Sequence, residues 1–250
     1  MQEIDLKSLK PDLRKILLIG KEGTGKTNFI KTMPKPIYLF SFDKGYLTLA
    51  GEDGIKVGLC MDEDRYRPKA YVEFKKKFDA LKAGEMYKGA DGKEVPYQTI
   101  ALDNISFLST SLFDYLQAIN NNIDKPGGFT VYGLLKSKMQ DIINQSILLA
   151  NYVVCTALVQ TDKDDVTGEI FFNPDMVGSI RDEVGAWFDA VFYTEVDKKP
   201  TTGEKQYKLI TVGERRQRAK IRVPSSIAKR ISAVEVPDFK LLINKIKGSA

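Results

Sequence analysis

The residues with the clearest chemical meaning lie at positions 20–27, where the sequence reads Gly-Lys-Glu-Gly-Thr-Gly-Lys-Thr. An apolar run at 16–19 precedes them and a mixed stretch at 28–31 follows, so the pattern predicts a strand, a glycine-rich turn and the start of a helix. Glycines allow the backbone to fold tightly around an anion, with successive N–H groups and the helix N-terminus directed at phosphate oxygens. The spacing therefore indicates a phosphate-binding P-loop rather than a chance glycine turn.

Two side chains at the end of this loop complete its chemistry. Lys26 is expected to place a positive charge on the β- and γ-phosphates of a nucleotide, and the Thr27 hydroxyl is expected to be a ligand for Mg²⁺. The residues predicted to bind the nucleotide are consecutive: Glu22, Gly23, Thr24, Gly25, Lys26, Thr27 and Asn28.

Two aspartates each follow an apolar run of strand character. Asp103 ends the run 98–102, and Asp43 comes just after the run 37–41. Open α/β sheets bind ligands at the carboxyl ends of their strands, and a P-loop enzyme holds its Mg²⁺ there through an acid of the Walker B type. Asp103 is therefore predicted to share the metal with Thr27, whereas Asp43 is either a second carboxylate of the site or only a turn former.

The composition excludes several other kinds of chemistry. The chain has no histidine and only two cysteines, Cys60 and Cys155, which lack metal-ligand spacing, so zinc sites and serine–histidine catalysis are excluded. The net charge of +5 is modest and does not by itself indicate a nucleic-acid-binding protein. The sequence contains no apolar run of about 18 residues, which predicts a cytoplasmic protein without a membrane partner.

Strand-like and helical patterns alternate along the chain, which predicts an α/β fold with a mostly parallel sheet flanked by helices. The 250 residues, 43% of them hydrophobic, are enough for one substantial core. The predicted divisions are a lead-in at 1–14, one domain at 15–224 and a helical extension at 225–250. Further predicted features are strands at 55–59 and 152–158, helices at 71–81, 105–119 and 131–149, a small hairpin at 87–95, a long loop at 161–180, and a C-terminal antiparallel hairpin at 188–212 turning at Thr202-Gly203.

Two later features have more than one interpretation. Gln160 stands just past the predicted strand 152–158, where its amide either senses a phosphate or only caps the strand. A basic run follows the antiparallel hairpin, and it is either a solvated edge strand protected by its charges or a binding surface. The run consists of Arg215, Arg216, Arg218, Lys220 and Arg222.

Taken in order, these motifs resemble those of one family, the phage-encoded RecA-like ATPases that assist single-strand annealing and recombination. The resemblance covers about residues 12–225, and the P-loop is its one highly specific motif. The other matching segments are Asp43-Lys44-Gly45, Leu102-Asp103-Asn104, the strand ending at Gln160, Trp187-Phe188-Asp189-Ala190-Val191, and Arg218-Ala219-Lys220-Ile221-Arg222.

The resemblance implies a RecA-like P-loop NTPase core that binds ATP and Mg²⁺ and assembles with copies of itself into a ring or filament. It also implies nucleotide at the subunit boundary and single-stranded DNA along loops that face the axis. A single-strand DNA-binding protein is a further implied partner, and the implied location is the cytoplasm of a phage-infected host.

Carried over residue by residue, the resemblance assigns Lys26 to the phosphates and Thr27 and Asp103 to the Mg²⁺. It makes Gln160 the sensor that opens the second DNA-binding loop.

Two further sites bear on catalysis. Lys220 and Arg222 resemble the basic pair that one RecA-like subunit offers to its neighbour's γ-phosphate, where they stabilise transition-state charge as arginine fingers do. The family's water-activating residue is a glutamate just beyond the second strand. Here the nearest acid is Asp43, which would orient the water, while a simple alignment puts Lys44 at that site.

The leading hypothesis is an ATP-hydrolysing recombination protein that assembles on single-stranded DNA and assists annealing or strand exchange. The departure at Lys44 keeps open a nucleotide-dependent assembly or DNA-binding module with little hydrolysis. A small-molecule kinase built on the same loop is the third hypothesis, and the lack of an arginine-bearing helical lid between the middle strands argues against it.

Overall fold

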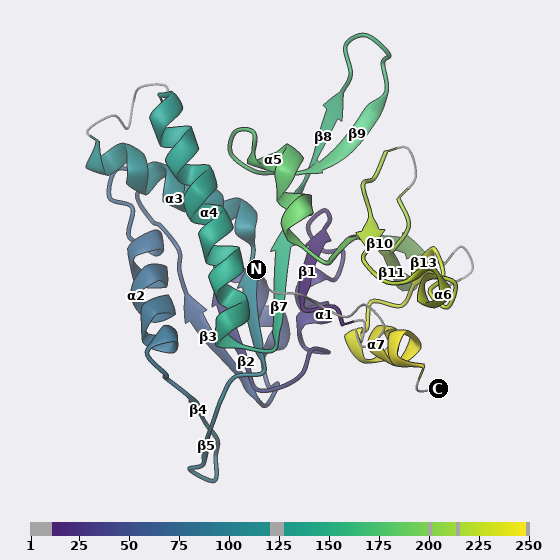
Figure 1. Cartoon of the computed structure of the whole chain (residues 1–250), viewed down its shortest axis with the longest axis horizontal. Helices are drawn as coiled ribbons and strands as arrows, with labels where there is room; N and C mark the ends of the chain where they lie inside the picture. The colour runs from purple at the N-terminus through teal and green to yellow at the C-terminus, as the bar shows by residue number, and fades with distance from the viewer. Residues whose placement is uncertain (1–11, 121–127, 200–201, 214–215, 249–250) are drawn as a thin grey trace, which may run out of the picture.

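The computed structural model describes residues 12–120, 128–199, 202–213 and 216–248. One large sheet with helices on both faces dominates them (Figure 1). Its strands are β1 (Lys15–Ile19), β2 (Ile37–Ser41), β3 (Ile55–Leu59), β6 (Thr99–Asp103), β7 (Tyr152–Ala157), β10 (Ala190–Lys198), β11 (Lys205–Ile210), β12 (Lys220–Ile221) and β13 (Val234–Glu235). Two separate hairpins pair β4 (Tyr87–Lys88) with β5 (Glu94–Val95), and β8 (Val159–Lys163) with β9 (Ile170–Pro174).

The helices fall between these strands. They are α1 (Lys26–Ile30), α2 (Ala70–Lys82), α3 (Ile105–Ile119), α4 (Phe129–Leu149), α5 (Ile180–Glu183), α6 (Ser225–Ala228) and α7 (Phe239–Lys247), with short 3₁₀ turns at η1 (Lys44–Leu49) and η2 (Val184–Trp187).

The strand order places the P-loop strand near the middle of the sheet. The order is β13-β11-β10-β1-β7-β6-β2-β3, with β12 also beside β10. Neighbouring strands from β3 to β10 are all parallel, whereas β11 and β12 pair with β10, and β13 with β11, in the antiparallel direction. The predicted α/β fold, with its mostly parallel sheet and C-terminal antiparallel hairpin, is confirmed.

Alternate residues of each central strand face two different cores. On β1, Leu17 and Ile19 belong to the core formed with α2, α3 and α4, whereas Ile16 and Leu18 belong to the core formed with α1 and α7. Because both faces of the sheet are covered, its central strands are continuous apolar runs without polar alternation.

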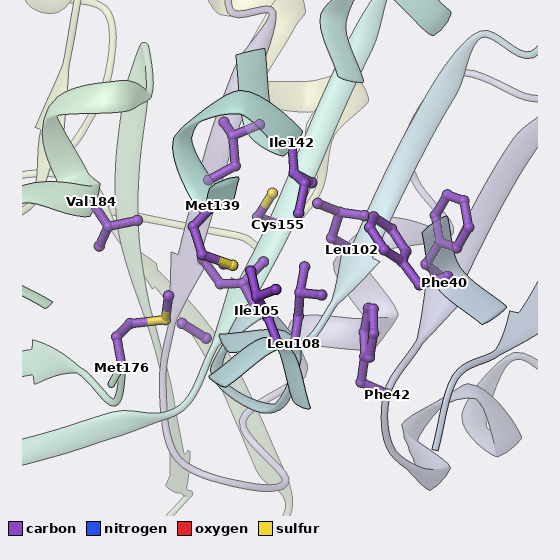
Figure 2. Packing of buried hydrophobic residues seen from close by; sticks show 14 of the residues in the cluster. Phe40, Phe42, Leu102, Ile105, Leu108, Met139, Ile142, Cys155, Met176 and Val184 are labelled. Carbon is purple, nitrogen blue, oxygen red and sulfur yellow. The ribbon is translucent and has the colours of Figure 1, made fainter. Parts of the chain in front are cut away.

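The first core is rich in aromatic rings (Figure 2). The Phe40 ring on β2 has its centroid 4.7 Å from the Tyr38 ring and 4.8 Å from the Phe74 ring of α2. Leu102 on the neighbouring strand β6 and Leu108 on α3 are fully buried in the same core. This packing holds the end of β6 against α3, and the end of β6 is where Asp103 lies.

The predicted long loop at 161–180 is wrong. Residues 159–174 form a hairpin in which β8 and β9 pair from Val159↔Pro174 to Lys163↔Ile170, and Gly168 turns it with a φ of 71°. The hairpin extends away from the body of the protein (Figure 1), and Val166 near its tip is 94% exposed. Because solvent covers both faces of its outer part, no apolar alternation marks these strands in the sequence.

The C-terminal helix α7 packs against α1, the helix that follows the P-loop. The Phe239 ring of α7 stands edge-on to Phe29 of α1, with the two ring centroids 6.4 Å apart, and the Phe239 N–H donates to Thr32 Oγ1 at 2.9 Å. The predicted domain boundary between 224 and 225 remains a prediction.

Of the helices in the described ranges, none combines the length and apolar character needed to cross a membrane. Most of the predicted lead-in, residues 121–127 and Arg215 of the basic run lie outside the described residues.

Candidate nucleotide-binding site

The loop between β1 and α1 has the backbone that its glycines predict. Gly23 and Gly25 have φ angles of 73° and 90°, a region that residues with a Cβ rarely adopt. A Cβ on Gly20 would lie 2.2 Å from Oγ1 of Thr194 on β10, so close packing also requires a glycine there. The Thr24 hydroxyl hydrogen-bonds the same Thr194 hydroxyl at 2.7 Å, which ties the loop to β10.

Lys26 lies at the start of α1 and is 8% exposed. Its Nζ donates to the backbone carbonyls of Gly20 at 2.7 Å and Lys21 at 2.8 Å. Burial lowers the pKa of the Lys26 ammonium, and the nearby Asp103 and Asp43 carboxylates act in the opposite direction. Since an ammonium has three donors, these two bonds leave one that can serve an anion in the loop.

Asp103 is 2% exposed at the end of β6 and is held between two hydroxyls. The Thr27 hydroxyl donates to its Oδ2 at 2.8 Å, and the Thr156 hydroxyl on the adjacent strand β7 donates to its Oδ1. Burial raises the pKa of Asp103 above its usual range, although both hydrogen bonds and the charge of Lys26 act to lower it. The carboxylate and the Thr27 hydroxyl together form an oxygen donor set, which is the kind that Mg²⁺ prefers.

Asp43 lies at the carboxyl end of β2 and begins the turn η1. Its Oδ1 accepts the Gly45 N–H at 2.7 Å, and its Oδ2 accepts the Asn104 side-chain N–H at 2.8 Å. Asp43 is thus a turn former, and its link to Asn104 connects the ends of β2 and β6. Its role as a second carboxylate of the site stays a prediction.

A cleft of about 520 Å³ brings these residues together. It is lined by Glu22, Gly23, Gly25, Lys26, Thr27, Asn28, Asp43, Lys44, Gly45, Thr48, Asp103, Asn104, Phe107, Leu158, Lys205 and Tyr207. Thr24, predicted to bind the nucleotide, is buried, with its hydroxyl on Thr194, and is not among these lining residues.

Several lining residues were missed by the sequence interpretation. Lys205 and Tyr207 on β11 are far from the P-loop in sequence, as is Phe107 on α3. Lys44 and Lys205 add two cations to the lining of the cleft beside Lys26. The one available signal was the alternation in β11, which places 205, 207 and 209 on one face.

Three predicted site residues lie elsewhere in the described chain. Gln160 is on β8, where its amide donates to Asp162 Oδ1 at 3.0 Å, and it does not line the cleft. Lys220 is paired with Val191 near the amino end of β10, and Arg222 follows with its guanidinium donating to the Ala186 carbonyl at 2.8 Å. Lys220 and Arg222 therefore lie toward the edge of the sheet opposite the P-loop of their own chain.

The fold and the site together define the class of the protein. A parallel sheet whose central strand leads through a P-loop into a helix, with a buried aspartate two strands away, is the core of a P-loop nucleoside triphosphatase.

The family is shown by a sequence comparison. A family model described as an AAA domain matches residues 13–223, so the chain belongs to this family of P-loop ATPase domains. A comparison with curated proteins gives no significant match.

The burial of the Asp103 carboxylate leads to a prediction for the free energy of unfolding of the nucleotide-free protein. Since its pKa is raised by folding, the ionised form opposes folding once the pH exceeds the usual aspartate range. Asp103→Asn is therefore expected to increase the free energy of unfolding at neutral pH by about 0.5–2 kcal/mol. The gain should vanish below a pH of about 4, where the carboxyl is protonated in both states. Urea denaturation at the two pH values measures this.

The matched control is Asp165→Asn on the exposed β8–β9 hairpin, for which little change is expected. A loss of stability in Asp103→Asn at neutral pH would mean that the two threonine hydrogen bonds outweigh the burial of the charge.

Proposed function

We propose that this chain hydrolyses ATP with Mg²⁺ and, as the resemblance to RecA-like recombination ATPases suggests, does so when assembled on single-stranded DNA. One observation supports the proposed hydrolysis of ATP. The Thr27 hydroxyl and the Asp103 carboxylate meet at 2.8 Å where the P-loop opens into the cleft. Thr27 and Asp103 would hold Mg²⁺ through these oxygens, and the metal would supply positive charge to offset the negative charge of the phosphates.

Backbone and side-chain groups of the chain bind the phosphates and orient the attacking water. The P-loop N–H groups and Lys26 bind the phosphates, with the ammonium donor that the Gly20 and Lys21 carbonyls leave free directed at the anion. Asp43 orients the attacking water, since its carboxylate is fixed by the Gly45 and Asn104 donors and still has free lone pairs.

Lys44 also lines the cleft, but a protonated ammonium cannot accept a proton from water. Asp43 is therefore the proposed water-orienting residue, in place of the family's glutamate.

The DNA-binding part is supported by the distribution of charge. Arg216, Arg218 and Arg222 are exposed, and Lys220 is partly exposed. The β8–β9 hairpin occupies the position where the resemblance puts a DNA-binding loop, yet it carries Asp162, Asp164, Asp165 and Glu169 against the single base Lys163. Because carboxylates repel phosphates, we assign the DNA contact to the basic segment 216–222 and not to the hairpin tip.

The test of the proposed function is the rate of ATP hydrolysis with and without single-stranded DNA. We expect Mg²⁺-dependent turnover that single-stranded DNA stimulates, and we expect Lys26→Ala to bind ATP weakly and to lose turnover. Lys31→Ala is the matched control, because this lysine lies on the solvent side just after α1 and pairs with Glu52.

Each other result points to a different function. ATP binding without turnover, with or without DNA, would favour a nucleotide-dependent assembly module. Transfer of phosphate to a metabolite would favour a kinase. Unchanged ATP affinity in Lys26→Ala would refute the P-loop assignment itself.

A second variant separates binding from the chemical step. Asp43→Asn keeps a side-chain oxygen for the Gly45 N–H but has a much weaker base, so we expect ATP affinity within about threefold of the wild type and a loss of turnover of about 10²-fold or more. Equilibrium binding and single-turnover hydrolysis measure the two effects. Asp53→Asn, an exposed turn residue, is the control. Full activity of Asp43→Asn would transfer the catalytic role to another residue.

A third prediction concerns assembly. Lys220 and Arg222 lie away from the cleft of their own chain, so any catalytic action requires a neighbouring copy. If Lys220 and Arg222 act on a neighbour's γ-phosphate as arginine fingers do, the double variant Lys220→Ala, Arg222→Ala should lower turnover by about 10³-fold. Mixing this double variant with Lys26→Ala should restore part of the activity, because some interfaces then combine an intact P-loop with intact fingers.

The competing role is direct contact with DNA phosphates. In that case mixing restores nothing, and the double variant binds DNA more weakly with a salt dependence reduced by about one ion per lost charge.

A further inference from the structure

The P-loop cleft has a second end, away from the metal-binding pair. Strands β6 and β11 lie on opposite sides of β1, each separated from it by one strand. Asp103 ends β6, and Tyr207 lies on β11, so the two residues line the cleft from opposite sides of the P-loop. A triphosphate chain whose terminal phosphate lies at Thr27 and Asp103 must therefore direct its other end away from β6.

Tyr207 reaches this end of the cleft because the β10–β11 hairpin extends beyond the P-loop. Ile19, the last residue of β1, is paired with Tyr193 of β10, yet β10 continues to Lys198. Tyr207 is paired with Val196 in this overhanging part.

One face of β11 leads from the core to the cleft. Leu209 is fully buried beside α1, Tyr207 is half-buried, and Lys205 is exposed, with both of the latter lining the cleft. Gln206 and Lys208 have the opposite orientation, as the alternation of a strand requires.

The Tyr207 ring lies directly against the P-loop backbone. A Cβ built on Gly25 would meet ring atoms Cδ1 at 3.0 Å, Cε1 at 3.5 Å and Cγ at 3.6 Å. A flat aromatic surface thus borders the cleft beside the last glycine before α1. Neither phosphate nor Mg²⁺ needs an aromatic partner, whereas a nucleobase stacks on one readily.

We propose that Tyr207 is the stacking surface for the base of the bound nucleoside triphosphate. The inference rests on the proposed function and assigns the nucleoside end of the same site to β11. Recognition of a π-face contributes affinity for any base and supplies little discrimination between them.

The experiment measures binding by calorimetry with two probes, Mg-ATP and inorganic triphosphate with Mg²⁺. The proteins compared are the full-length wild type, Tyr207→Ala, Tyr207→Phe and Gln206→Ala, each checked for folding by circular dichroism. Tyr207→Ala should weaken ATP binding by about 10-fold or more while leaving triphosphate binding unchanged. Tyr207→Phe, which keeps the ring, should bind ATP within about threefold of the wild type, and Gln206→Ala on the opposite face of β11 should match the wild type.

Two results would overturn the proposal while leaving the phosphate site intact. Unchanged ATP affinity in Tyr207→Ala would show that the ring does not contact the base. Equal weakening of ATP and triphosphate binding would show that the ring only supports the Gly25 turn. Failure of the wild type to bind either probe would refute the proposed function together with this inference. Lys26→Ala is the control for the phosphate site, because it should weaken the binding of both probes, whereas loss of the base site should weaken the binding of ATP alone.

Discussion

The site depends on the burial of one acidic side chain. Asp103 lies at the end of β6 with almost no exposure, between a threonine of the P-loop helix and a threonine of the neighbouring strand. A carboxylate is tolerated there only because hydroxyl donors and the Lys26 ammonium stand nearby. The P-loop helix, β6 and β7 must therefore keep their relative positions, and the aromatic core behind β6 provides the rigid support for this.

Much of the fold and part of the site could be predicted from the sequence. The glycine spacing at 20–27 specifies its own turn through positive φ angles, which are local properties of the chain. Strands covered on both faces are uninterrupted apolar runs, so Asp103 at the end of β6 and Asp43 just beyond β2 stand out.

What could not be predicted depends on distant parts of the chain meeting. Thr156 has the ordinary appearance of a β-branched residue within a strand, and only the pairing of β6 with β7 makes it a partner of Asp103. Tyr207 becomes a lining residue only through the register of β11 on β10. The β8–β9 hairpin escaped prediction for a different reason. β8 is polar after Val159 and β9 begins with three consecutive apolar residues, so neither strand shows a period of two.

Strand β10 has a consequence that extends beyond the cleft. Its first residues pair with β1 on one side and with the basic strand β12 on the other, while its last residues carry β11 over the P-loop. A paired strand is stiff along its length, because each peptide unit is fixed by hydrogen bonds to its neighbours. One continuous strand, β10, therefore joins the side of the cleft that β11 forms to the strand that carries Lys220.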